Sequence, residues 1–100
     1  MTKQQAIELE ESIDNLFSEK LETNCEVSMA LAGALRISLN NGFININSRT
    51  KRVAWVKWNG DYDELQDYIN KIIVVITGNE EKIEMLINSY KMKPFLDESE

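Results

Sequence analysis

The 100-residue chain contains no histidine and only one cysteine. The absence of histidine excludes Ser-His-Asp and Cys-His catalytic arrangements, the commonest general base and most zinc sites. The lone Cys25 has no second cysteine with which to form an internal disulfide, so the chain does not fit the class of disulfide-stabilised secreted domains. We therefore interpret Cys25 as a small, buried apolar side chain.

Long apolar runs and glycine-rich loops are also missing. The longest apolar run, residues 72–76, has five residues, far below the roughly 18–20 that a membrane helix needs. The N-terminal residues lack the pattern of a signal peptide. The four glycines are isolated, which excludes a phosphate-binding loop, and the paired carboxylates lie at predicted helix starts or on solvated faces. We expect a cytoplasmic protein with no membrane partner, and we predict no catalytic residue, no metal site and no cofactor.

Hydrophobic residues make up 43% of the chain, enough for a core without disulfides or metal. The length predicts a single domain over residues 1–100. The single proline, Pro94, ends the last predicted helix, and we expect residues 94–100 to form a frayed tail.

Residues 2–22 are predicted to form a helix, because Thr2 and Gln5 make a capping-box pattern ahead of an apolar stripe. That stripe consists of Leu9, Ile13, Leu16, Phe17 and Leu21. Two further helices are predicted over 61–77 and 80–92, the first opened by Asp61 with Glu64 and closed at Thr77-Gly78-Asn79. The β-branched run 72–76 leaves a fourth strand open as an alternative.

Between the helices, apolar residues alternate from Val27 to Leu39, which predicts a strand interrupted at Gly33 by a bulge or bend. The alanines keep a helix over 27–36 open. Asn41-Gly42 is the signature of a two-residue hairpin turn, and it places Leu39 opposite Ile44.

A second reversal near residues 48–51 places Asn47 opposite Arg52 and Ile44 opposite Trp55. The predicted core face of this three-stranded meander, spanning about 27–58, then holds Leu35, Ile37, Leu39, Ile44, Ile46, Val53 and Trp55. The second face holds Arg36, Ser38, Phe43, Asn45, Asn47, Arg52, Val56 and Trp58. The predicted fold class is α+β in two layers: an N-terminal helix, an antiparallel meander, then one or two C-terminal helices.

Charge is unevenly distributed along the chain, whose formal net charge is −6. Residues 27–60 contain no acid but five cations, whereas residues 1–26 contain seven acids and residues 61–100 contain ten. The sheet is therefore basic and the helices acidic. Two arrangements remain open: the helices cover both sheet faces, or one basic, aromatic face is exposed.

For an exposed face, the predicted partner-binding residues are Arg36, Phe43, Arg52, Val56 and Trp58, because arginine and aromatic residues are typical of interaction hot spots. A second candidate surface is the acidic face of the first helix, formed by Glu8, Glu11, Asp14, Glu19 and Glu22. Small size, acidity and absent catalytic groups are typical of bacterial or phage inhibitors and immunity or anti-defence proteins.

We therefore predict a non-catalytic protein that occludes a site on a larger protein partner, which could itself handle nucleic acid. One alternative is a single-stranded nucleic-acid binder that uses the sheet, although the flanking acids disfavour it. Another is an acidic secretion-type chaperone, and a homodimer is left open.

Overall fold

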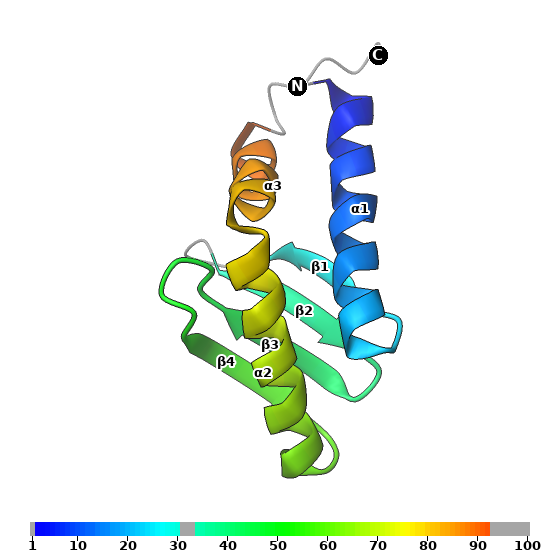
Figure 1. The fold of residues 1–100 in the computed structure, drawn as a ribbon, viewed down its shortest axis with the longest axis vertical. Coiled ribbons are helices and arrows are strands. Elements are labelled where there is room, and N and C mark those ends of the chain that lie inside the picture. Colours follow the sequence, from blue (N-terminus) through cyan, green and yellow to red (C-terminus); the bar gives the residue numbers. More distant parts are fainter. Residues whose placement is uncertain (1, 31–33, 93–100) are drawn as a thin grey trace.

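A computed structural model describes residues 2–30 and 34–92 and confirms the α+β class (Figure 1). The predicted tail over 94–100 lies outside these residues. Along the chain the elements are α1 (Lys3–Leu21), β1 (Glu26–Met29), β2 (Leu35–Leu39), β3 (Gly42–Ile46), β4 (Val53–Trp58), α2 (Tyr62–Gly78) and α3 (Glu80–Met92). The four strands form one antiparallel sheet in the order β1-β2-β3-β4.

All three helices follow the sequence prediction closely. The capping box at α1 is confirmed: the Gln5 N–H donates to Thr2 Oγ1 at 3.1 Å, and the Thr2 N–H donates to Gln5 Oε1 at 2.8 Å. Asp61 caps α2, accepting from the Asp63 N–H at 2.9 Å. The β-branched run 72–76 is helical, and its successive turns place Ile72 and Ile76 in the core.

The predicted strand over 27–39 is in fact two strands, β1 and β2, paired antiparallel with Val27 opposite Ile37. The helical alternative over 27–36 is therefore wrong where the structure describes the chain. The alternation was interpreted correctly as β-structure, but the reversal within it was missed. The Ala30 N–H donates to Ala34 O at 2.7 Å and closes this hairpin. The bulge predicted at Gly33 lies outside the described residues.

The turn between β2 and β3 is centred on Asn40 and Asn41, one position earlier than predicted. Leu39 pairs with Gly42 and Ile37 with Ile44, so the predicted register is wrong by two residues. Gly42 belongs to β3, where its φ is 146° and an added Cβ would lie 1.9 Å from Lys57 O. Position 42 requires glycine because β4 approaches too closely for a side chain. A shift of two residues leaves every side chain on its predicted face.

A bulge in the last hairpin changes which residues of β4 face the core. Asn47 and Arg52 are opposite each other as predicted, and the Asn47 N–H donates to Arg52 O at 2.9 Å. The register then shifts between Asn45 and Ile46, so that Ile44 lies opposite Val56 instead of Trp55. Because an extra residue inverts the alternation that follows it, Val56 and Trp58 face the helices and Trp55 faces away.

The helices α1 and α2 lie side by side on one face of the sheet, and α3 packs beside the N-terminal half of α1 (Figure 1). The core between the layers contains Phe17 and Ile13 from α1, aliphatic side chains of the sheet, and Ile72 and Ile76 from α2. On α3, the side chains of Ile83, Leu86 and Ile87 are buried as well.

Candidate binding surface on the sheet

The face of the sheet opposite the helices, here called the outer face, is built from two rows of paired residues. One row is Ser28, Arg36, Asn45 and Trp55, and the other is Glu26, Ser38, Phe43 and Lys57. Their neighbours in each strand point into the core, and successive residues of a strand point to opposite faces. Among the described helices, α1 and α2 both lie on the other side of the sheet (Figure 1).

Trp55 is the most prominent apolar side chain on the outer face, with 62% of its surface exposed. The predicted set named Trp58 and Val56 in its place, and their assignment to this face is wrong. Trp58 packs edge-on against Tyr68 of α2, with ring centroids 5.7 Å apart, and its Nε1–H donates to Asp61 O at 3.1 Å. It therefore joins the end of β4 to the start of α2.

Arg36 and Phe43, two members of the predicted set, lie on the outer face and contact each other. The Arg36 guanidinium carbon lies 4.1 Å from the centre of the Phe43 ring, a cation–π arrangement. The Arg36 Nε–H also donates to Asn45 Oδ1 at 3.0 Å. Asn45 is itself buried beneath these side chains. The two contacts hold the guanidinium in one orientation across the middle of the sheet.

The five cations of residues 27–60 divide into two groups. Arg49 and Lys51, in the loop between β3 and β4, form ion pairs with Glu84 and Glu80 of α3 at 2.9 and 2.7 Å. Asn47 Oδ1 shapes this loop by accepting from the N–H groups of Arg49 and Thr50 at 2.9 and 3.0 Å.

The other group is Arg36, Lys57 and Arg52, and none of these three forms an ion pair with a described residue. Arg36 and Lys57 lie on the outer face. Arg52 is exposed just before β4, opposite Asn47. The acids of the described helices lie on the far side of the sheet, so among the residues that the structure describes only Glu26, at the β1 edge, opposes these cations on this face.

The second candidate surface, on α1, keeps four of its five predicted residues. Glu8, Glu11, Glu19 and Glu22 are exposed. Asp14 instead turns toward β1, where its Oδ1 accepts from the Val27 N–H at 2.8 Å. Burial raises the pKa of Asp14, as do the nearby charges of Glu26, Glu10 and Glu11, and the Val27 hydrogen bond opposes that rise.

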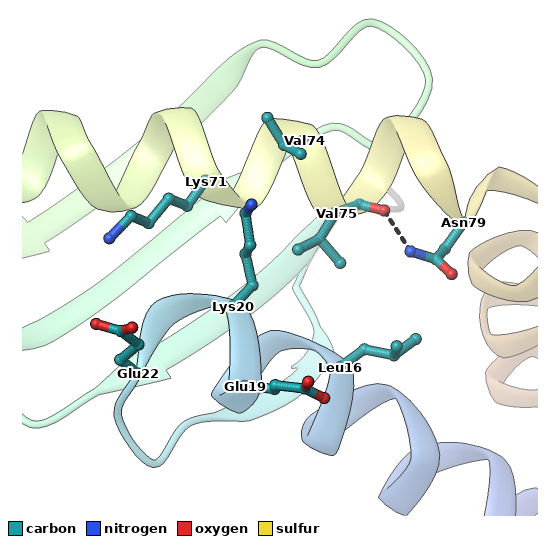
Figure 2. A pocket seen from close by; sticks show the side chains of 8 residues that line it. All are labelled: Leu16, Glu19, Lys20, Glu22, Lys71, Val74, Val75 and Asn79. Carbon is teal, nitrogen blue, oxygen red and sulfur yellow. Dashed lines mark hydrogen bonds between the residues drawn. The ribbon is translucent and has the colours of Figure 1, made fainter.

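An open groove between α1 and α2 includes part of this acidic surface (Figure 2). Glu19 and Glu22 line it with Lys20 from α1, and Lys71 and the exposed Val74 line it from α2. Lys71 is already paired with Asp67 at 3.0 Å. Since acids and lysines alternate around the groove, its charges favour neither an anionic nor a cationic ligand.

Cys25 is buried, as predicted, beside Ser18 of α1. The Cys25 N–H donates to Ser18 Oγ at 3.2 Å, and the Ser18 hydroxyl lies 3.4 Å from the sulfur. Burial raises the pKa of the Cys25 thiol, so the group stays protonated at neutral pH. In the described part of the chain, no cluster of histidine, cysteine, aspartate and glutamate is placed to hold a metal ion. None of the helices described is long and apolar enough to cross a membrane.

Comparison with protein families, with characterised proteins and with solved structures finds no match to this chain. The outer face must therefore be interpreted from its own chemistry. Its most exposed aromatic residue, Trp55, was missed from the sequence because strict alternation places it in the core. The bulge in β4 causes this difference, and the alternation of apolar residues does not reveal a bulge.

Proposed function

We propose that this chain is a small, non-catalytic binding protein that docks on a larger protein through the outer face and occludes a site there. The observation that carries the proposal is Trp55, 62% exposed in the same row as Arg36 on a sheet face that none of the described helices covers. Tryptophan and arginine are the residue types that contribute most often to binding hot spots.

The arrangement of Arg36 supports this proposal. Ordering a long side chain on binding costs about 0.5–1.5 kcal/mol. The Phe43 ring and Asn45 Oδ1 already hold the Arg36 guanidinium, so part of that cost is met before the partner arrives. Because the guanidinium is planar and presents several N–H donors, it suits a carboxylate on the partner.

The charge of the outer face indicates the chemistry of the partner. In the described part of the chain, Arg36, Lys57 and the neighbouring Arg52 outnumber the one acid on this face, Glu26, so a partner surface with acids around an apolar pocket fits best. The pocket would take the Trp55 indole, and the acids would meet the cations around it. This complementarity increases the association rate and the specificity of binding more than the affinity.

The test is affinity capture from the native host with the wild-type chain and the variant Trp55→Ala/Arg36→Glu, followed by mass spectrometry. Tyr62→Ala is the matched control, since Tyr62 is 75% exposed but lies at the start of α2. We expect the double variant to lose a protein that the wild type and the control both retain. Retention of every captured protein by the double variant would refute the proposal.

A second candidate function, binding of single-stranded nucleic acid, is favoured by one feature of the fold. The helices and most of their acids lie across the sheet from the outer face, which weakens the repulsion predicted from net charge. Phe43 and Trp55 lie on neighbouring strands with Lys57 opposite Phe43, the ingredients of a base-stacking surface. Fluorescence anisotropy with labelled oligonucleotides over a salt series tests it, and no binding at low salt excludes it.

A further inference from the structure

The strand β4 is an edge of the sheet and is unusually apolar for one. It spans Val53–Trp58, and five of its six residues are apolar, with Lys57 the exception. The opposite edge, β1, has only four residues and begins with the exposed Glu26. Short length and charge are ordinary protections of an edge strand against pairing with another chain, and β4 has little of either.

The backbone groups of β4 that point away from the sheet can be identified from the pairing with β3. The Asn59 N–H donates to Asn41 O at 2.8 Å, just beyond the last strand pair. Hydrogen-bonded and non-hydrogen-bonded pairs alternate in an antiparallel ladder, so Trp55 and Lys57 bond to β3. Val56 and Trp58 therefore direct their N–H and C=O groups outward, from an edge with which no other described strand pairs.

Apolar side chains flank this edge on both sides. On the outer face lies Trp55, and on the helix side lies Val53, which is 39% exposed. The helix α2 also has a side that faces away from α1, opposite the side on which Lys71 and Val74 line the groove between the two helices. By helical spacing, that far side carries the half-buried Ile69 and Ile73 and the exposed Tyr62.

We infer that β4 pairs antiparallel with β4 of a second copy of this chain, with the two-fold axis at Val56. In this register Val56 lies opposite Val56 of the other copy, Ala54 opposite Trp58, and Trp55 opposite Lys57. Both copies then keep their helices on the same side of one continuous sheet. The outward N–H and C=O groups of Val56 and Trp58 meet partners, and each Lys57 ammonium lies beside an indole ring.

The alternative registers are less complementary. Moving the axis to Lys57 places two ammonium groups directly opposite each other, which is unfavourable. Moving it to Trp55 leaves each Lys57 opposite an apolar Val53. A strand from another protein would satisfy the same backbone groups, but β4 itself supplies the cation and the aromatic ring that pair across the axis. Strand-edge interfaces of this kind fall near or below the usual ~1,200–2,000 Å² of stable complexes, so the dimer should dissociate on dilution.

The first test is sedimentation equilibrium of the wild-type chain over a concentration series. The inference is independent of the proposed partner, so no partner is needed. We expect the mass to rise from 11.5 kDa toward twice that value. A mass of 11.5 kDa at every concentration would overturn the inference.

Disulfide trapping then tests the register, in a Cys25→Ala background that removes the native thiol. Val56→Cys places two thiols on opposite residues, with Cα atoms about 5.5 Å apart. That separation lies within the range for a disulfide. Ala54→Cys is the control: its two copies are four residues apart along the strands, roughly 13 Å. We expect oxidation to link the first variant covalently and to leave the second without a covalent link, and equal linking of both contradicts the register.

A charge exchange provides a third test in the folded protein. Trp55→Lys places a lysine opposite Lys57 of the other copy, while the exposed position leaves the fold intact. We expect the dimer dissociation constant to rise about tenfold or more. Adding Lys57→Glu should lower the dissociation constant again, because it creates an ion pair across the axis. An unchanged dissociation constant in Trp55→Lys, with unchanged circular dichroism, would overturn the inferred pairing.

Discussion

At the scale of single residues, Asp14 shows how one side chain joins two layers. Its Oδ1 accepts the Val27 N–H at 2.8 Å and so fixes the start of β1 on α1. Asp14→Ala leaves this part-buried donor without a partner, which should cost about 1–3 kcal/mol in the free energy of unfolding. Asp14→Asn keeps an acceptor oxygen at the same place, so its loss should be much smaller. Urea denaturation of both variants measures the difference, and equal losses would contradict the role of the hydrogen bond.

Asp14 also predicts a pH dependence. Because burial raises the pKa of Asp14 in the folded protein above its ordinary value of 3.8, the folded state binds the proton more tightly than the unfolded state. The contribution of Asp14 to stability therefore falls as pH rises from that value through the folded pKa. Asp14→Asn should lack this fall. The check is the difference in unfolding free energy between wild type and variant across this acidic range.

Tyr90 predicts the corresponding effect in alkali. It lies half-buried on α3, and burial raises the pKa of Tyr90 from its ordinary 10.0 to about 12, assisted by the negative charges of Glu10 and Asp14. Since the folded pKa is raised, stability should be lost as pH increases from about 10 toward 12. Tyr90→Phe should remove this loss. Ultraviolet absorbance follows ionisation of the phenols, and Tyr62→Phe, which removes an exposed phenol, is the control. Ionisation of Tyr90 near pH 10 would contradict the prediction.

At the scale of elements, two glycines predict opposite responses to alanine. At Gly42 the backbone φ is 146° and an added Cβ would meet Lys57 O at 1.9 Å, so Gly42→Ala must separate β3 from β4. We expect a loss of about 1–3 kcal/mol or more in unfolding free energy. Gly78→Ala, at the end of α2, meets nothing within 4 Å. It should be neutral or stabilise by up to about 1 kcal/mol. Thermal denaturation of both variants tests the pair.

The bulge between β3 and β4 predicts different environments for the two tryptophans. Trp55 is 62% exposed, whereas Trp58 packs on Tyr68 and donates to Asp61 O. Acrylamide should therefore quench the fluorescence of Trp58→Phe, which keeps only Trp55, much more strongly than that of Trp55→Phe. The reverse order would mean that β4 follows strict alternation without a bulge.

The helices could be predicted almost to the residue because their caps and stripes are local signals. Thr2 with Gln5 marks the start of α1, and Ile72 with Ile76 marks the buried side of α2. The details of strand pairing could not be predicted, because they depend on contacts between strands. Gly42 resembled a turn residue in the sequence, but its glycine is required by the backbone of β4.

The candidate surface was predicted only in part, for the same reason. Arg36 and Phe43 precede the bulge, so strict alternation places them correctly. Val56 and Trp58 follow it and were placed on the wrong face, while Trp55 was missed. Because of one extra residue in β4, Trp55 lies on the outer face and Trp58 on the core face, the reverse of the prediction. The alternation of apolar residues in one sequence does not reveal where a β-bulge inserts an extra residue.

At the scale of the whole molecule, the cations of the sheet region fall into two groups, one paired with acids of α3 and one on or beside the outer face. Arg49 and Lys51 bind Glu84 and Glu80, joining the loop after β3 to α3. Both acids and Arg49 are well exposed, so each ion pair should contribute at most about 1 kcal/mol to stability, less at high salt. A double-mutant cycle on Arg49 and Glu84 measures that coupling.

The cations of the outer face should affect capture of the partner, whereas those of the loop between β3 and β4 should affect only stability. Arg36→Glu removes the cation above Phe43 and the hydrogen bond to the buried Asn45, so it should lower stability by about 1–3 kcal/mol. Under the proposed function it should also weaken capture of the partner at temperatures where circular dichroism shows the variant to be folded. Arg49→Glu reverses the same charge on the loop that binds α3, so it should leave capture intact. Both variants change the net charge equally, so a general effect of charge would weaken both alike. Equal weakening would mean that the whole field of the protein, and not the outer face, selects the partner.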